Sequence, residues 1–240
     1  TMLKSSRCPQ FKEEEVRRQA ICNLNEAGIE ALVVIGGDGS FRGANALYEE
    51  FDFPVVGIPG TIDNDIYGTD FTIGFDTAIN TAVEAIDKIR DTADSHNLLF
   101  FVEGMGRDAG FIGLYTGIAT GAEQCLIPEY HTDVDKLCQY LVNERRKNKT
   151  SGIIVVAEGD DAGSAHEVAA QVKERLPHCA KNAKRKFYPP LKNKVNYVNL
   201  IYNLKKFAKK KFLTHIRTRC WKKIKSGLNM MVLFMNKFKN

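Results

Sequence analysis

Two short segments of the chain carry the residue types that phosphoryl transfer needs. Gly36–Ser40 (GGDGS) offers glycines, which let a backbone approach a phosphate closely, and one carboxylate for a metal ion. Pro59–Asp65 (PGTIDND) offers the hydroxyl of Thr61 and the carboxylates of Asp63 and Asp65. Together they provide an anion cradle, a metal ligand and a base, the groups that move a phosphoryl group between two oxygens.

Each of these segments follows a short apolar run that predicts a buried strand. Residues 31–35 (ALVVI) precede the first segment, and residues 54–58 (PVVGI) precede the second. Runs this short and this rich in Val and Ile are typical of parallel sheets. Because open α/β sheets bind ligands at the carboxyl ends of their strands, we expect both segments at the ligand edge of a sheet.

The glycine segment predicts a nucleotide site with a metal ion. The carboxylate of Asp38 can approach Mg²⁺ that bridges nucleotide phosphates, and the amides of Gly39 and Ser40 face the anion at a helix start. A tight turn that uses Asp38 only structurally is the alternative.

The second segment predicts the base. In an extended loop, side-chain alternation points Thr61, Asp63 and Asp65 to one side. We interpret Asp63 as the proton acceptor for a sugar hydroxyl, and Asp65 as a group that orients it or assists the metal. The alternative is an Asx-rich capping turn.

The remaining pattern predicts a doubly wound α/β fold up to about residue 170. Helices are expected over residues 11–27, 40–50, 76–92, 109–121 and after 133, and further strands over residues 98–102, 125–127 and 153–156. Alternating strands and helices predict mostly parallel sheets flanked by helices in a three-layer sandwich. A third glycine loop after the 98–102 strand places Arg107 at the ligand edge, where a guanidinium suits the phosphate of an acceptor.

Charge divides the chain sharply. Residues 1–170 hold 14 Lys and Arg against 28 Asp and Glu, whereas residues 171–240 hold 20 against one. For the basic segment 178–240, three interpretations stay open: a solvated, partly helical tail, a patch for nucleic acid or a membrane surface, and a tail foreign to the ancestral fold. The six cysteines are scattered, which favours reduced thiols in a cytoplasmic protein. We recognise no signal peptide and no apolar run long enough to cross a bilayer, so we expect a protein outside the membrane.

Four motifs, in this order and spacing, resemble the bacterial-type ATP-dependent 6-phosphofructokinases. They are GGDGS, PGTIDND, GTDFTIGFDTA from Gly68 and MGRDAG from Met105. The resemblance extends from Thr1 to about Pro177. It implies transfer of the γ-phosphate of MgATP to fructose 6-phosphate in glycolysis by an allosteric homotetramer.

The resemblance also implies roles for individual residues. ATP would be contacted by Arg7, Cys8, Gly37, Asp38, Gly39 and Ser40, with Asp38 as the Mg²⁺ ligand. The sugar phosphate would be held by Thr61, Ile62, Asp63, Met105, Gly106, Arg107 and Glu158. Catalysis would rest on Asp63 with Thr61, Asp65 and Arg107. A nucleotide effector would meet Arg90, Gly121, Ala122, Glu123, Lys147 and Lys149.

The resemblance further implies a domain plan and a donor. Residues 1–74 would form a partial ATP-binding domain, residues 75–177 a partial domain for sugar phosphate and effector, and residues 178–240 a basic tail that does not match. Gly39 and Gly60 stand where pyrophosphate-using relatives carry bulkier residues, which favours ATP.

Several departures accompany the resemblance. From the resemblance we expect this chain to lack the first strand and phosphate loop of the family. Leu98 lies where an Arg usually reaches the sugar phosphate of a neighbouring subunit. Gly104 replaces a branched apolar residue, and the strands expected after Pro177 are missing, so we expect exposed apolar edges and impaired activity.

Two rival functions stay open. One is a related glycine-loop kinase acting on a nicotinamide dinucleotide or a lipid. The other is an inactive phosphofructokinase-like protein that binds nucleic acid or another partner through the basic tail.

Overall fold

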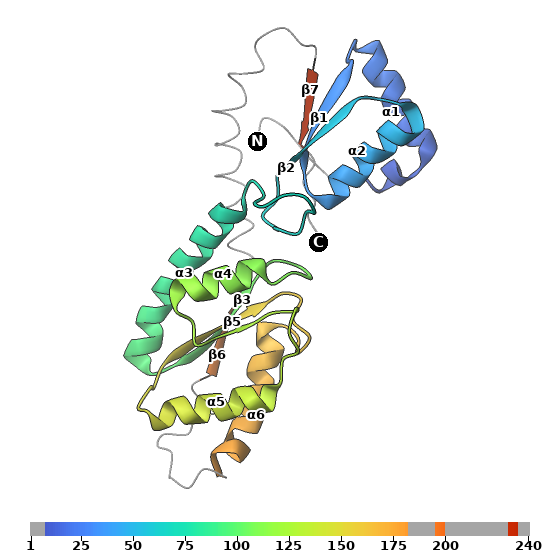
Figure 1. Cartoon of the computed structure of the whole chain (residues 1–240). Coiled ribbons are helices and arrows are strands. Elements are labelled where there is room, and N and C mark those ends of the chain that lie inside the picture. Colours follow the sequence, from blue (N-terminus) through green and yellow to red (C-terminus); the bar gives the residue numbers. More distant parts are fainter. Residues whose placement is uncertain (1–7, 182–194, 200–229, 235–240) are drawn as a thin grey trace. The chain divides into compact units, whose positions relative to one another are not determined.

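The computed structural model describes residues 8–181, 195–199 and 230–234, which fall into two compact units (Figure 1). The described part of unit 1 contains residues 8–61, 66–74 and 230–234. That of unit 2 contains residues 62–65, 75–181 and 195–199. Neither unit is one continuous stretch of chain, so each is built from segments far apart in sequence.

Unit 1 is organised around a three-stranded parallel sheet. Its central strand β1 (Ala31–Gly36) pairs with β2 (Val55–Pro59) on one side and β7 (Met230–Phe234) on the other. The strands expected before the GGDGS and PGTIDND segments are confirmed. Strand β7 lies in the segment expected to be a non-matching tail, and it covers the edge of β1 that was expected to be exposed.

The described part of unit 1 has three helical elements: the 3₁₀ turn η1 (Pro9–Lys12), α1 (Glu14–Glu26) and α2 (Asp38–Phe51). Apolar side chains of β1 and α2, together with Phe53 from the loop after α2, form a buried cluster of Leu32, Val34, Ala44, Leu47 and Phe53. Helix α1 contributes half-buried side chains to this cluster, and its one fully buried residue is Arg17. A buried guanidinium needs a partner, because burial without one is costly.

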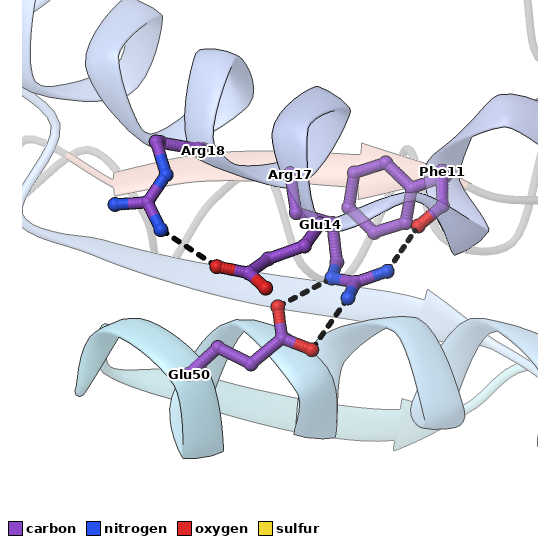
Figure 2. A network of polar contacts seen from close by, with 5 residues as sticks. All are labelled: Phe11, Glu14, Arg17, Arg18 and Glu50. Atoms are coloured by element: carbon purple, nitrogen blue, oxygen red, sulfur yellow. Dashed lines mark hydrogen bonds and ion pairs between the residues drawn. The ribbon is translucent and has the colours of Figure 1, made fainter.

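Glu50 supplies that partner, as Figure 2 shows. The Arg17 Nε and Nη2 atoms donate to the two carboxylate oxygens of Glu50 at 2.6 and 2.5 Å, and Nη1 donates to the Phe11 carbonyl oxygen at 2.8 Å. The hydrogen bond to Glu50 raises the pKa of Arg17 above its ordinary value. One side chain therefore joins η1, α1 and α2. The neighbouring Arg18–Glu14 pair, at 2.6 Å, is exposed.

The substitution Glu50→Ala should lower the midpoint of thermal unfolding by several degrees, because it leaves the Arg17 guanidinium buried with only the Phe11 carbonyl. The substitution Glu14→Ala, which removes the exposed pair with Arg18, should leave the midpoint nearly unchanged. Circular dichroism melts of both variants measure the difference. Equal midpoints for the two variants would show that the buried pair has no special role.

Unit 2 contains a four-stranded, fully parallel sheet in the order β4-β5-β3-β6. Its strands are β3 (Leu99–Gly104), β4 (Gln124–Leu126), β5 (Gly152–Ala157) and β6 (Val195–Asn199). Every residue of β3 and β5 is buried, as expected for central strands covered on both faces. Strand β6, like β7, lies in the segment for which no strand was predicted.

Helices cover both faces of this sheet: α3 (Phe75–His96), α4 (Phe111–Thr120), α5 (Val134–Arg146) and α6 (Ala165–Lys181) (Figure 1). Alternate residues of β3 face opposite ways. Leu99 and Phe101 pack with α5 and α6, whereas Phe100 and Val102 pack with α3. The predicted α/β architecture of parallel sheets flanked by helices is thus confirmed.

Two helix ends illustrate what the sequence could and could not predict. The helix expected after Asp133 begins there, because the Asp133 carboxylate accepts hydrogen bonds from the amides of Asp135 and Lys136 at 3.0 and 3.1 Å. Helix α6 was not predicted as such, and it continues through Pro177 to Lys181. Among the described helices, none combines the length and apolar composition that crossing a membrane requires.

Candidate active site

A candidate nucleotide site lies in unit 1, where β1 ends and α2 begins. Gly37 caps α2, and its carbonyl accepts hydrogen bonds from the amides of Ser40 and Phe41 at 2.9 and 3.1 Å. A Cβ added to Gly37 would lie 3.4 Å from the Cβ of Thr61, so the loops that follow β1 and β2 are in close contact. The positive end of α2 is therefore positioned to bind an anion.

Asp38 stands in the first turn of α2 with a side chain that is 42% exposed. Its Oδ1 atom accepts a hydrogen bond from Arg42 Nε at 3.2 Å. A single accessible carboxylate beside a helix N-terminus fits Mg²⁺ that arrives on nucleotide phosphates and keeps most of its waters. Of the other residues expected at the nucleotide, Gly39 and Cys8 are exposed, Ser40 is buried, and Arg7 lies outside the described residues.

The carboxylates of the PGTIDND segment occupy different environments. Asp63 is 8% exposed, whereas Asp65 is exposed, so the two carboxylates are not equivalent. Thr61 belongs to unit 1, and the Ile62–Asp65 segment belongs to unit 2. Ile62 packs against the buried cluster of Phe75, Ala78 and Ile112, and this contact holds the start of the segment in unit 2.

Arg107 is the charged neighbour of Asp63 within unit 2. Its Nε atom lies 3.4 Å from Asp63 Oδ2, and its side chain is 35% exposed. The turn after β3 uses a positive φ at both Gly106 (150°) and Arg107 (53°). Because a left-handed conformation is unfavourable for a residue with a Cβ, the turn holds Arg107 at some conformational cost. Its guanidinium balances the negative charge of the nearly buried Asp63.

Glu158 joins this group from the neighbouring strand. Its amide donates to the Gly104 carbonyl at 2.9 Å, which extends the pairing of β3 with β5 by one bond. Its Oε2 atom accepts from the Arg107 amide at 3.4 Å. Six of the seven residues expected around a sugar phosphate, all except Thr61, therefore belong to unit 2. Contacts link three of them, Asp63, Arg107 and Glu158.

The residues expected at an effector site form a second group in unit 2. Arg90 donates to the Thr120 carbonyl at 2.5 Å, next to Gly121 and Ala122 at the end of α4. Glu123, whose side chain is 4% exposed, pairs with Lys149 at 2.8 Å and accepts a hydrogen bond from the Ile153 amide. Lys147 instead pairs with Glu144 at 2.7 Å. These carboxylates raise the pKa values of Lys149 and Lys147.

Two departures noted in the sequence have clear structural counterparts. Leu98 is half-buried and packs against the apolar cluster beneath α3, so it forms part of the core rather than a charged contact. A Cβ added to Gly104 would meet its nearest neighbours at 3.9 and 4.0 Å, which is ordinary contact.

Two buried carboxylates escaped the sequence analysis, Glu103 and Asp160. A signal for Glu103 was present: it is the one charged residue in the apolar run 98–104 (LLFFVEG). Asp160 lies next to Asp161 in an acidic stretch, so nothing in the local sequence indicates that it is buried.

The substitution Gly159→Ala should disrupt this site. The new Cβ would lie 2.1 Å from the Arg107 carbonyl oxygen, so the loops that hold Arg107 and Glu158 must separate. The matched substitution Gly104→Ala, on the partner strand, should be tolerated. Thermal melts of both variants, with crystal structures where possible, measure the outcome. A Gly159→Ala variant as stable as Gly104→Ala would contradict the described contact between the loops.

Comparison with known proteins identifies the family. The sequence profile of the family described as Phosphofructokinase matches residues 1–187, more than three quarters of the chain. The chain is 55% identical over 177 residues to ATP-dependent 6-phosphofructokinase 2 of Bacteroides thetaiotaomicron, covering 74% of this chain and 54% of that protein. It is 62% identical over 159 residues to ATP-dependent 6-phosphofructokinase of Macrococcus caseolyticus, covering 66% of this chain and 50% of that protein. The chain belongs to the phosphofructokinase family and spans about half the length of these curated relatives.

Solved structures agree with this assignment. Phosphofructokinase from Saccharomyces cerevisiae superposes with a TM-score of 0.70 at 32% identity, over 85% of this chain and 29% of that one. The T-state phosphofructokinase of Pichia pastoris superposes with a TM-score of 0.72 at 29% identity, over 98% of this chain and 26% of that one. The match therefore extends to the fold as well as the motifs.

Proposed function

We propose that this chain phosphorylates fructose 6-phosphate with ATP, giving fructose 1,6-bisphosphate. The observation that carries the proposal is the contact of Asp63 with Arg107, beside Glu158, which pairs a nearly buried carboxylate with a cation that suits a phosphate. The curated relatives named above are ATP-dependent 6-phosphofructokinases, which supports the same substrates. As an enzyme of glycolysis, the protein would act in the cytoplasm.

The proposed reaction assigns one task to each group. Asp63 accepts the proton of the sugar hydroxyl while the oxygen of that hydroxyl bonds to the γ-phosphorus of ATP. At the same time, the bond from the γ-phosphorus to the β,γ-bridging oxygen breaks, and ADP leaves. Arg107, Glu158 and the Met105–Gly106 backbone bind the sugar phosphate. Mg²⁺ held through Asp38 would neutralise charge on the nucleotide phosphates.

The choice of donor rests on two glycines. Gly39 is exposed in the first turn of α2, and Gly60 is buried just after β2. Neither residue adds a side chain where a nucleoside must fit. ATP is therefore the proposed donor rather than pyrophosphate.

The substitution Asp63→Asn tests the base. It should lower kcat by about a hundredfold or more, because asparagine keeps the shape of the side chain but cannot act as a general base. The affinity for MgATP, measured by calorimetry, should stay within about twofold, since the α2 N-terminus that binds nucleotide is unchanged. Coupled release of ADP measures turnover.

Asp87→Asn is the matched control, because Asp87 is an exposed carboxylate of α3 with no role in the proposed reaction. It should cost far less activity. An equal loss in both variants would overturn the assignment of the base. If the wild-type chain releases no ADP with fructose 6-phosphate but does so with a nicotinamide dinucleotide or a lipid acceptor, the proposed function is wrong.

We also propose that the chain self-associates, as the resemblance to a homotetrameric family implies. Helix α4 supports this proposal with an apolar stripe: Phe111, Tyr115 and Ile118 are 40%, 45% and 71% exposed at a spacing that places them on one face. Apolar side chains aligned in this way are typical of an interface between subunits.

The double substitution Tyr115→Lys with Ile118→Lys should shift the chain to a smaller assembly, because two buried cations would have to be desolvated at the interface. Light scattering after size exclusion measures the mass. Tyr130→Lys, at a residue that is 75% exposed outside this stripe, is the control and should leave the mass unchanged. A double variant with wild-type mass would remove α4 from the interface.

The second group in unit 2 supports a proposed nucleotide effector site, with Arg90, Gly121, Ala122, Glu123, Lys147 and Lys149 as its residues. Both lysines are paired with carboxylates in this structure, so an effector phosphate must compete with Glu123 and Glu144 for them.

A further inference from the structure

Glu103 is a buried carboxylate for which the proposed reaction has no direct use. It is the penultimate residue of β3 and is 7% exposed, at the end of a strand whose preceding residues are all apolar. Burial raises the pKa of Glu103 above its ordinary value, and the nearby carboxylates of Glu158 and Glu167 add to that rise. A charged side chain in such a place needs a compensating interaction.

The start of α6 provides that interaction. The amide of Ala165, the first residue of α6, donates to Glu103 Oε2 at 3.1 Å, and this hydrogen bond lowers the pKa of Glu103 against the effect of burial. The first amides of a helix have no partner within the helix and carry a partial positive charge. The carboxylate of Glu103 therefore fixes the position of the α6 start relative to the end of β3.

Two consecutive residues of β3 consequently hold both ends of one loop. The loop runs from Glu158 to Ser164 and connects β5 to α6. At its start the Glu158 amide donates to the Gly104 carbonyl at 2.9 Å, and immediately after its end the Ala165 amide donates to Glu103. Unlike Gly104, which binds through its backbone, Glu103 binds through its side chain, so mutation can remove its contact.

Asp160 fixes the middle of the same loop. It is 6% exposed; its Oδ1 atom accepts from the Ala162 amide at 3.0 Å, and its Oδ2 atom accepts from Thr132 Oγ1 at 2.9 Å. The loop is thus held at its start, middle and end, and Glu158, at its first position, lies against Arg107. Loss of the end contact leaves the loop tethered by Asp160 and the Gly104 carbonyl.

We infer that Glu103 is a positioning residue for the sugar-phosphate site: by anchoring α6 to the end of β3, its side chain holds Glu158 and Arg107 in the arrangement that binds the acceptor. Glu103 acts through these residues and touches no substrate itself. The inference rests on the proposed function, because it concerns the affinity of that site for fructose 6-phosphate. The rival explanation is that Glu103 only stabilises the core of unit 2.

The test uses three variants of the whole chain. Glu103→Ala removes the acceptor for the Ala165 amide and should raise KM for fructose 6-phosphate about tenfold, as expected for losing one hydrogen bond to a charged group. KM for MgATP should not change. Glu103→Gln keeps an acceptor oxygen at the same reach and should restore most of the affinity. Glu103→Asp has a side chain shorter by one methylene and should give a KM for fructose 6-phosphate between those of the other two variants. It replaces the alanine variant in the comparison if that variant does not fold.

A second measurement does not depend on activity. Hydrogen exchange followed by mass spectrometry should show faster exchange of the amides at 158–165 in Glu103→Ala, with unchanged exchange in β1 and β2. Glu50→Ala is the control for lost stability: it should lower the melting midpoint without altering KM for fructose 6-phosphate or exchange at 158–165.

Each outcome decides a specific point. Faster exchange at 158–165 together with a raised KM for fructose 6-phosphate supports the inference. An unchanged KM, or a glutamine variant no better than alanine, overturns it and leaves Glu103 a core residue. If wild-type chain does not phosphorylate fructose 6-phosphate, the proposed function fails, and exchange alone then decides whether Glu103 positions the loop.

Discussion

The parallel pairing of β3 with β5 is the constraint on which the acceptor half of the site depends. Their register matches Gly104 with Ala157, so the two strands end at the same level and the turns that follow them must meet. The pairing continues one residue further, through the Glu158 amide, and a side chain at Gly159 would collide with the Arg107 carbonyl. Arg107 and Glu158 are neighbours because buried backbone groups leave the two turns no other arrangement.

Much of this could be predicted from the sequence, since the signals are local. The Val- and Ile-rich runs of residues 31–35 and 153–156 predict strands by themselves, and the glycine loop at residue 104 follows from its strand. The proposed class of ligand rests on local signals as well, because the glycines and carboxylates at each strand end can be interpreted separately. The helix expected after residue 133 belongs to the same kind of prediction.

What the sequence did not show depends on distant partners. Strand β7 (MMVLF) is a short apolar run and strand β6 (VNYVN) is a mixed polar and apolar run within a basic segment. Their pairing with β1 and β3 makes them strands. Simple alternation treated Asp63 and Asp65 alike, yet the packing of Ile62 in a buried cluster separates their environments. The burial of Arg17 was not predicted either, because its partner, Glu50, lies 33 positions away in the sequence.

The interleaving of the two units has a consequence for how the protein is made. The sheet of unit 1 takes two strands from residues 31–59 and its third from residues 230–234, so on a ribosome its last strand emerges after nearly all of unit 2 has been synthesised. Domains generally fold as units during synthesis, but here β1 must keep an unpaired edge open until then. Contacts between such distant parts of a chain form slowly, and an apolar open edge invites pairing with other chains. Growing chains are consequently most aggregation-prone before residues 230–234 emerge and pair with β1, and a chaperone would have the most to protect in that interval.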